Sequence, residues 1–407
     1  MKDFLSVYLD YTKENEAPEL FHLWSAIAVV GHVLNRKVCL DQYYFKLYPG
    51  QIMVALVSES AVSRKTTAID LAVGLMRALP EEEVNIIEGQ SSSKSLLMQL
   101  DRGEDEEGRK KPAIGFLVAD ELGNLLRRES FAENLATDIC ALNTTVDKDF
   151  SRVMGCGTIV LHLPCVGGLF GTTPTGLGHE IPKVAQTAGL LGRIISVYQD
   201  ETERANPLVE PPKGLYQHKA WLIKELYRMS KLQGGFKFDA DGKEFYVKWY
   251  QRWKKESSGQ DEQTGFYGRK AGHLLRVAMV FAAMMGDALV LTKPVLIAAM
   301  KALNTVHLLM PMAFKKMGSH PSNEHSDRII AKIRRAGGRI QKSVLLQYMW
   351  PWLPGENFRS VMQNLTVAGV VQLEIEKTAT KPKSFYRLAV SKGEFLAKVE
   401  DKFSEEE

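Results

Sequence analysis

Apolar residues at the start of the chain recur at helical spacing. Segment 2–35 is predicted to be mostly helical, and its clearest helix covers Glu19–Leu34, where apolar positions three and four residues apart form one face. These positions are Leu20, Leu23, Trp24, Ile27 and Val30. A polar, tyrosine-rich pair of strands is predicted around Lys37–Leu47. Residues 1–50 are therefore expected to form a helical collar.

Short apolar runs alternate with helical segments from residue 51 onward. The predicted strands are Met53–Val57, Val84–Ile87, Phe116–Ala119, Ile159–Leu163, Val166–Phe170 and Gly192–Tyr198. The predicted helices between them are Ala68–Leu79, Ser93–Leu100 and Leu122–Leu142. Because strands that alternate with helices favour a parallel sheet covered by helices, residues 51–205 are predicted to form an α/β core.

Stretches rich in proline and small residues mark the boundaries of the later regions. Residues 201–212 contain three prolines and are predicted to be a linker. Segment 213–317 is predicted to be a helical lid, and residues 318–324 a second linker. The acidic tail, residues 391–407, is expected to be a frayed end.

Residues 325–390 show the pattern of a small separate domain. Three helices and then two strands are predicted, at Ser326–Arg335, Lys342–Met349, Glu356–Ala368, Val370–Ile375 and Ser384–Leu388. Three helices and a β-hairpin make a winged helix, in which the third helix commonly enters the DNA major groove. Such domains also serve as spacers between proteins, so a role in protein contact stays open.

Composition narrows the class of protein. Of the 407 residues, 45% are hydrophobic and 25% charged, which is typical of a globular protein with two or three domains. No run approaches 18 apolar residues without charge, and the N-terminus lacks a signal-peptide pattern, so no membrane association is expected. The four cysteines, Cys39, Cys140, Cys156 and Cys165, show no C-x-x-C spacing, which favours reduced thiols in a cytoplasmic protein.

Positive charge is concentrated near the C-terminus. Residues 325–390 hold 11 Lys and Arg against 4 Asp and Glu, a net charge of +7, and residues 391–407 hold 3 against 6, a net charge of −3. Because the whole chain carries +4, residues 1–324 sum to zero. Excess positive charge on a compact domain is typical of DNA-binding proteins, although it also serves solubility. The predicted DNA contacts are Arg359, Gln363 and Asn364 on the third helix and Lys377, Lys381 and Lys383 on the hairpin.

One apolar strand runs into a loop that carries phosphate-binding chemistry. Met53–Val57 is followed by Ser58–Arg64 and then by Lys65, Thr66 and Thr67, where a helix is predicted to begin. At such a junction, loop N–H groups and the helix N-terminus face an anion, a lysine neutralises it and a hydroxyl ligates magnesium.

The loop departs from the usual pattern G-x-x-x-x-G-K-[ST]. Glu59 and Arg64 stand at the two glycine positions, where glycine would let the backbone approach phosphate closely. By itself the loop therefore fits a turn with a surface lysine equally well. The predicted nucleotide-binding residues in it are Ser63, Arg64, Lys65, Thr66 and Thr67.

A second apolar strand ends in two acidic residues. Phe116–Ala119 is followed by Asp120 and Glu121. Such a pair supplies one carboxylate near the magnesium ion and a second that acts as a base and polarises water. The two segments together predict an NTPase. Thr66 and Asp120 are the predicted magnesium ligands, and Lys65 and Glu121 are predicted to be catalytic.

Polar residues after two later segments fit the same chemistry. Thr172 and Thr173 follow a predicted strand, at the carboxyl end where ligands of open α/β sheets lie, and a threonine there would orient the attacking water. Arg193 follows a glycine-bounded turn and would contact a neighbouring subunit's γ-phosphate, although a local salt bridge fits its spacing equally. Arg269 and Arg276 would lie over the nucleotide from the lid, or else on a solvated helix face.

The order of these motifs resembles the helicase-like ATPase family of phages and integrative elements, whose members are often fused or adjacent to a primase-polymerase. The similar runs are Glu16–Trp24, Arg64–Ile69, Ala119–Leu122, Gly171–Pro174 and Gly192–Arg193, within residues 3–310. The resemblance implies an AAA+-type P-loop core, a ring-forming oligomer, ATP and Mg²⁺, and translocation on DNA near a replication fork. It also implies that Thr172 or Thr173 is a sensor and that Arg193 acts in trans.

The chain departs from this family where Ser58, Glu59 and Ala61 replace residues that are usually Gly or Pro. We therefore expect an ATP-dependent DNA helicase or translocase, with any primase on a separate chain. A nucleotide-switched initiator or regulator that hydrolyses weakly or not at all is the first alternative. A packaging or transposition ATPase, whose winged helix contacts a protein partner, is the second.

Overall fold

The computed structural model divides the chain into two compact units, Met1–Met317 and Gly318–Glu407. It describes residues 3–60, 62–89, 92–126, 132–144, 147–155, 157–181, 189–200, 204–208, 210–256, 265–314, 321–353, 355–367, 369–376 and 382–388. The predicted acidic tail and the predicted DNA contacts Lys377 and Lys381 lie outside the described residues.

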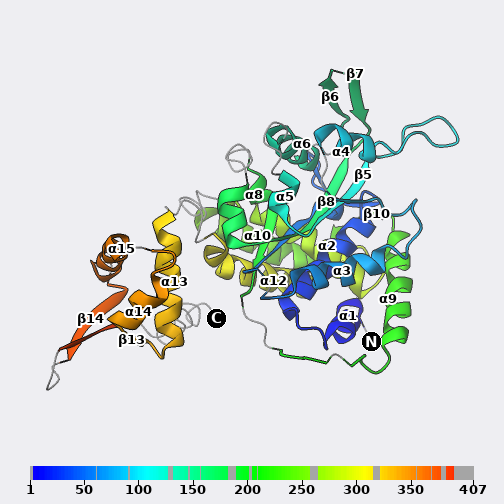
Figure 1. The fold of residues 1–407 in the computed structure, drawn as a ribbon. Coiled ribbons are helices and arrows are strands. Elements are labelled where there is room, and N and C mark those ends of the chain that lie inside the picture. The colour runs from blue at the N-terminus through cyan, green and yellow to red at the C-terminus, as the bar shows by residue number, and fades with distance from the viewer. Residues whose placement is uncertain are drawn as a thin grey trace. The chain divides into compact units, whose positions relative to one another are not determined.

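A five-stranded parallel sheet forms the centre of the first unit (Figure 1). In spatial order its strands are β4 (Ile86–Glu88), β5 (Ile114–Ala119), β8 (Cys165–Thr172), β3 (Met53–Val57) and β9 (Ile194–Tyr198). Strands β3, β8 and β9 are buried along their whole length, as expected for parallel strands with both faces covered. The predicted parallel sheet flanked by helices is confirmed.

Helix α2 (Glu19–Leu34) is the most deeply buried helix of the described residues near this sheet. It packs on α3 (Lys65–Met76), on β8 and on the short helix η1 (Pro49–Gln51). Helix α1 (Phe4–Thr12) packs on α2 and α9 (Leu215–Ser230). One continuous hydrophobic core joins these helices to the sheet, so the predicted collar shares its core with the α/β region.

The predicted lid consists mainly of four helices, α9, α10 (Ala240–Glu256), α11 (Lys270–Met285) and α12 (Lys293–Ala313). Helix α11 packs on α2, and α12 packs on β9. Two short parallel strand pairs involve this region. Strand β10 (Gly234–Gly235) pairs with β1 (Val38–Asp41) of the collar, and β11 (Lys237–Phe238) pairs with β12 (Val290–Leu291) within the lid. Strand β1 also pairs with β2 (Lys46–Leu47).

One helix among the described residues, α12, is long and apolar enough to cross a membrane by length and composition alone. A single helix of this kind is weak evidence, because a core helix of a globular protein passes the same test. Its apolar side chains Leu296, Leu303 and Val306 are fully buried in the core of the first unit.

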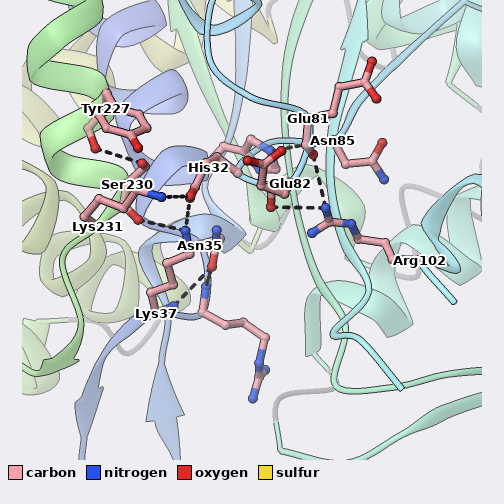
Figure 2. Close-up of polar contacts among 12 residues, drawn as sticks. His32, Asn35, Lys37, Glu81, Glu82, Asn85, Arg102, Tyr227, Ser230 and Lys231 are labelled. Atoms are coloured by element: carbon pink, nitrogen blue, oxygen red, sulfur yellow. Dashed lines mark hydrogen bonds and ion pairs between the residues drawn. The ribbon is translucent and has the colours of Figure 1, made fainter. Parts of the chain in front are cut away.

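A cluster of charged side chains joins α9 to the sheet (Figure 2). The Lys37 ammonium donates to the Ser230 carbonyl at 2.8 Å and to the Glu83 carboxylate, and Lys231 donates to the same carboxylate. Glu83 is only 4% exposed. Burial by itself raises the pKa of Glu83, but the hydrogen bonds from Lys231 and Lys37 outweigh it and hold that pKa below its ordinary value.

The amino edge of β4 carries a second polar contact set, also drawn in Figure 2. The backbone N–H of Asn85 donates to His32 Nε2 at 3.3 Å, and burial lowers the pKa of His32 to about 3. Arg102 donates to the carbonyls of Glu81 and Glu82 at 3.2 Å each. A neutral His32 therefore acts here as an acceptor that fixes the start of the strand.

Two elements of the first unit differ from the sequence prediction. The strand predicted at Ile159–Leu163 is β7 (Gly157–Leu161), which pairs antiparallel with β6 (Phe150–Met154) in a hairpin outside the parallel sheet. The single helix predicted over Leu122–Leu142 is divided into α5 (Leu122–Leu126) and α6 (Ala132–Thr144). Helix α4 (Ser93–Leu100) lies at its predicted place.

The described residues of the second unit form three helices and a three-stranded antiparallel sheet. Its elements are α13 (Pro321–Arg335), β13 (Arg339–Gln341), α14 (Lys342–Met349), α15 (Gly355–Val367), β14 (Val371–Glu376) and β15 (Lys383–Leu388). The sheet order is β13-β15-β14. The three helices and the hairpin match the predicted elements, and β13 is an additional strand. A separate hydrophobic core, which includes Ile329, Leu345 and Phe358, holds the unit together.

Candidate functional site

Three strands of the parallel sheet end at the same level. Val57, Thr172 and Tyr198, the last residues of β3, β8 and β9, are register partners. The connection that leaves β3 runs toward β4, and the connection that leaves β8 runs toward β9 on the other side of β3. Neighbouring strands whose connections leave in opposite directions create a crevice outside their carboxyl ends, where ligands of open α/β sheets bind.

The loop after β3 is folded around the amine of Lys65. The ammonium donates to the Ser58 carbonyl at 2.8 Å, to Ser58 Oγ at 3.0 Å and to the Glu59 carbonyl at 3.2 Å. The Ser58 N–H in turn donates to the Thr172 carbonyl at 3.3 Å, which ties the loop to β8. Burial lowers the pKa of Lys65, while the charges of Glu121 and Glu59 act in the opposite direction.

Arg64 closes this loop with an unusual backbone conformation. It is the N-cap of α3 and has a φ of 47°, in the left-handed region that favours glycine. Its side chain is 59% exposed, and its Nε donates to Glu16 Oε2 at 2.9 Å. The backbone of Arg64 thus makes the bend for which the usual pattern employs glycine, while its side chain is held by Glu16.

The remaining predicted loop residues lie around the start of α3. Ser63 is buried, and its Oγ donates to the Gln199 carbonyl at 3.1 Å, just after β9. Thr66 is exposed and Thr67 half-buried in the first turn of the helix. N–H groups in the first turn of a helix have no acceptor within the helix, and the helix dipole makes this end attractive to anions.

The structure brings Glu121 together with the two predicted threonines. A Cβ added at Gly176 would lie 2.8 Å from Thr172 Oγ1, 3.1 Å from Glu121 Oε1 and 3.2 Å from Thr173 Oγ1. Thr172 is fully buried. The Gly176 N–H donates to Thr173 Oγ1 at 2.9 Å. Because Glu121 also acts on the pKa of Lys65, these residues form one cluster at the carboxyl edge of the sheet.

Asp120 and Asp70 add acidic groups to the same edge. Asp120 is exposed directly after β5, and Asp70 lies on α3 four residues after Thr66, on the same helix face. Burial and the charge of Asp120 raise the pKa of Asp70. The sequence did not lead to a prediction of Asp70 as a site residue, although its position four residues after Thr66 could have indicated that both lie on one helix face.

No group of three or more His, Cys, Asp or Glu side chains in the described part of the chain is arranged to hold a metal ion by itself. Mg²⁺ usually binds through one or two carboxylates together with substrate phosphates. Thr66 and Asp120, the predicted magnesium ligands, would therefore need a nucleotide to supply further oxygens.

Arg193 lies at the opposite edge of the sheet. It ends α8 (Leu190–Arg193) directly before β9, whose first residue pairs with the first residue of β3. Its guanidinium donates to the Gly189 carbonyl at 2.8 Å. A Cβ added at Gly189 would lie 3.0 Å from Arg193 Nη1 and 2.9 Å from Arg269 Nη2, so the two guanidinium groups are neighbours. Burial and the charge of Arg193 lower the pKa of Arg269.

Arg276 does not join the predicted nucleotide residues. Its Nη2 donates to Gln51 Oε1 at 3.3 Å, and Gln51 precedes β3 at the amino edge of the sheet. Gln51 also exchanges hydrogen bonds with Asn143. Burial lowers the pKa of Arg276 to about 10. The expectation that Arg276 lies over the nucleotide is corrected, because α11 packs on α2 and η1 rather than over the loop.

A small pocket lies beside the loop after β3. It has a volume of about 210 Å³ and is lined by Glu16, Ala17, Pro18, Glu19, Leu20, Gln199 and Arg204. Two of these residues already bind the loop, since Glu16 accepts from Arg64 and Gln199 accepts from Ser63. The segment before α2 therefore contributes a wall to the candidate site, which the sequence prediction did not assign.

The predicted DNA contacts that the structure describes lie at the surface of the second unit. Arg359, Gln363 and Asn364 are exposed on α15, and Lys383 is exposed at the start of β15. Two carboxylates of the hairpin pair with β13, since Arg339 donates to Glu374 at 2.9 Å and also contacts Glu376.

The described cysteines carry free thiols. Cys140 and Cys165 are buried and Cys39 is half-buried, whereas Cys156 lies outside the described residues. Burial raises the pKa of Cys165 to about 12, so this thiol is not reactive at neutral pH.

In comparisons of the sequence with known proteins, no protein-family model and no curated protein matches the chain.

Proposed function

We propose that the first unit binds ATP with Mg²⁺ at the carboxyl edge of its sheet and hydrolyses it. We further propose that the protein is a DNA helicase or translocase of a phage or mobile element, working as an oligomeric ring. The observation that carries the proposal is the cluster of Lys65, Glu121 and Thr172 at the end of three adjacent parallel strands.

Each member of the cluster has a role that its surroundings support. Lys65 would exchange its bonds to the Ser58 and Glu59 carbonyls for phosphate oxygens, because a charged acceptor binds an ammonium more strongly than a neutral carbonyl does. Thr66 and Asp120 would hold Mg²⁺, which supplies charge neutralisation when bound. Glu121 would accept the proton of the attacking water, with Thr172 orienting that water.

The base of the nucleotide would lie in the pocket beside the loop. The pocket adjoins Ser63 and Arg64 through their partners Gln199 and Glu16. Its lining offers both apolar surface, from Pro18 and Leu20, and polar groups for the edge of a base.

Arg193 would serve the nucleotide of a neighbouring subunit rather than its own. The five residues of β9, at about 3.3 Å each, put about 16 Å between Arg193 and the loop of the same chain. A guanidinium at that distance is too far from its own chain's phosphates. In a cyclic assembly the same residue is repeated on each interface, where it would spread charge in the transition state.

The second unit would bind DNA as a winged helix. Its three helices, its β-hairpin and its net positive charge support this role. Exposed Arg359 and Gln363 on α15 are the candidates for contact with DNA.

The decisive experiment measures ATP hydrolysis with and without single-stranded DNA, for the wild type and for Glu121→Gln. We expect DNA-stimulated turnover that the substitution abolishes while ATP binding persists, because the amide keeps the shape but is not a base. Glu244→Gln is the matched control, since it makes the same change at an exposed carboxylate on α10 that pairs with Lys248 and has no part in the proposed chemistry. Unchanged turnover in Glu121→Gln would refute the assignment.

A non-hydrolysing switch is the second candidate, and the loop itself favours it. Glu59 and Arg64 occupy the glycine positions, and Glu59 adds a negative charge beside Lys65. Such a site would bind nucleotide in order to assemble an initiator or regulator. Tight ATP binding without turnover in the wild type would favour this candidate over the ATPase.

A further inference from the structure

A hollow lies between α14 and α15 in the second unit, and both helices are labelled in Figure 1. Its volume is about 640 Å³, within the range of about 300–1,000 Å³ that is usual for small-ligand sites. It is lined by Lys342, Leu346, Trp350, Gly355, Asn357, Phe358 and Arg359. We call this hollow the Trp350 pocket.

The sequence builds one wall of the Trp350 pocket from a helical stripe. Lys342, Leu346 and the C-cap residue Trp350 are spaced four residues apart and therefore lie along one side of α14. The adjacent stripe, Leu345 and Met349, is buried in the core of the unit and fixes the helix. Trp350 is nevertheless 61% exposed, so a large aromatic face is open to a ligand.

The opposite wall comes from the first turns of α15. Phe358 is 2% exposed and forms part of the core, so the floor of the pocket is apolar and firmly held. Asn357 and Arg359 on either side of Phe358 are exposed. The pocket thus combines an aromatic wall, an apolar floor and a polar rim.

The charge of the rim selects an anionic ligand. Lys342 and Arg359 are both exposed, and no Asp or Glu is among the lining residues whose side chains the structure describes. The carboxylates of Glu374 and Glu376 on β14 are bound by Arg339, so they do not neutralise the rim.

We propose that the Trp350 pocket binds a nucleotide of single-stranded DNA. The base stacks on the Trp350 indole, its edge meets the Asn357 amide, and Lys342 and Arg359 hold the flanking phosphates. A single strand is specified because bases within a duplex are already stacked on one another, whereas an unpaired base offers its face to an aromatic side chain. This inference rests on the proposed DNA-binding role of the second unit and adds the form of DNA that it recognises.

The test measures the affinity of the full chain for a labelled oligothymidylate and for a blunt DNA hairpin, whose two strands are joined by a non-nucleotide linker so that it holds no unpaired base, by fluorescence anisotropy. Trp350→Ala is expected to weaken oligothymidylate binding about tenfold or more, because base stacking on an aromatic side chain contributes substantially to single-strand affinity. Trp350→Phe retains an aromatic face and is expected to retain most of that affinity. Hairpin binding is expected to change little in either variant.

Trp352→Ala is the matched control. Trp352 is also exposed, at 47%, but it lies against Tyr348 and under the Arg328 guanidinium, outside the pocket lining. Its removal is expected to leave oligothymidylate affinity near the wild-type value. A thermal melt of each variant shows whether a loss of binding comes from a loss of folding.

Salt dependence tests the rim separately. Lys342→Ala is expected to reduce the slope of log affinity against log salt concentration by about 0.7 for a single strand, the value for one lost phosphate contact. The inference is overturned if Trp350→Ala binds oligothymidylate as the wild type does, or if it weakens single strand and hairpin equally.

Failure of this inference is distinguishable from failure of the proposed ATPase. A Trp350-dependent affinity for oligothymidylate, together with no ATP turnover, would support the proposed pocket and contradict the proposed ATPase. DNA-stimulated ATP turnover, together with oligothymidylate binding that does not depend on Trp350, would support the ATPase and contradict the proposed pocket. Binding of an acidic peptide at the pocket in place of oligothymidylate would also overturn the inference.

Discussion

At the scale of single residues, Arg64 shows how the loop is shaped without glycine. Its φ of 47° places a side chain in the left-handed region, which costs roughly 1–2 kcal/mol. Arg64→Ala keeps that conformation and loses the ion pair with Glu16, whereas Arg64→Gly loses the same pair but relieves the strain. We therefore expect Arg64→Gly to have the higher free energy of unfolding, by about 1 kcal/mol. Urea denaturation of both variants measures this difference, and an equal or higher stability of Arg64→Ala would contradict it.

At the scale of elements, periodicity predicted the components of the fold better than their assembly. The strand and helix around Lys65 and the strand before Asp120 were predictable, because each is a short apolar run next to polar residues. The packing of α11 was not predictable, since helical spacing shows which face of a helix is apolar but not which surface covers that face. For that reason Arg276 was predicted near the nucleotide but lies at the amino edge. Strand β13 has only three residues, too few for a visible alternation.

The attachment of α9 to the sheet through Glu83 yields a prediction of pH dependence. Because the pKa of Glu83 is held below its ordinary value of 4.5, the ionised form stabilises the folded state above about pH 4.5, and this contribution is lost as the pH falls through the lower, folded-state pKa. Glu83→Gln removes the charge that Lys37 and Lys231 bind. We expect it to lower the free energy of unfolding by about 1.5–3 kcal/mol at neutral pH.

Thermal or urea unfolding from pH 7 to pH 3 tests this expectation. The gap in stability between wild type and Glu83→Gln should be widest at pH 7 and should shrink as the pH falls below about 4.5. Glu82→Gln, at an exposed neighbouring position, is the control and should behave like the wild type. A gap that stays constant with pH would show that the charge of Glu83 is not what holds α9.

At the scale of the whole molecule, the separation of Arg193 from its own phosphate loop makes assembly testable. Arg193 and the loop lie at opposite ends of the same parallel strands, so the proposed ATPase site would take its Arg193 from a second chain. Arg193→Ala is expected to reduce ATP turnover about a thousandfold or more if this arginine acts on the transition state. Lys65→Ala is expected to abolish ATP turnover as well, because it removes the lysine proposed to bind the phosphates on the loop side of the site.

Mixing the two inactive variants separates an action between subunits from an action within one. In a mixed ring, a loop with intact Lys65 from one variant can face an intact Arg193 from the other, which restores about a quarter of the interfaces for random cyclic mixing. Recovered turnover in the mixture is therefore the expected result. Subunits carrying two different fluorophores report whether the variants exchange. Exchange without any recovery would mean that Arg193 supports the fold of its own chain, through its bond to Gly189, and does not complete a neighbour's site.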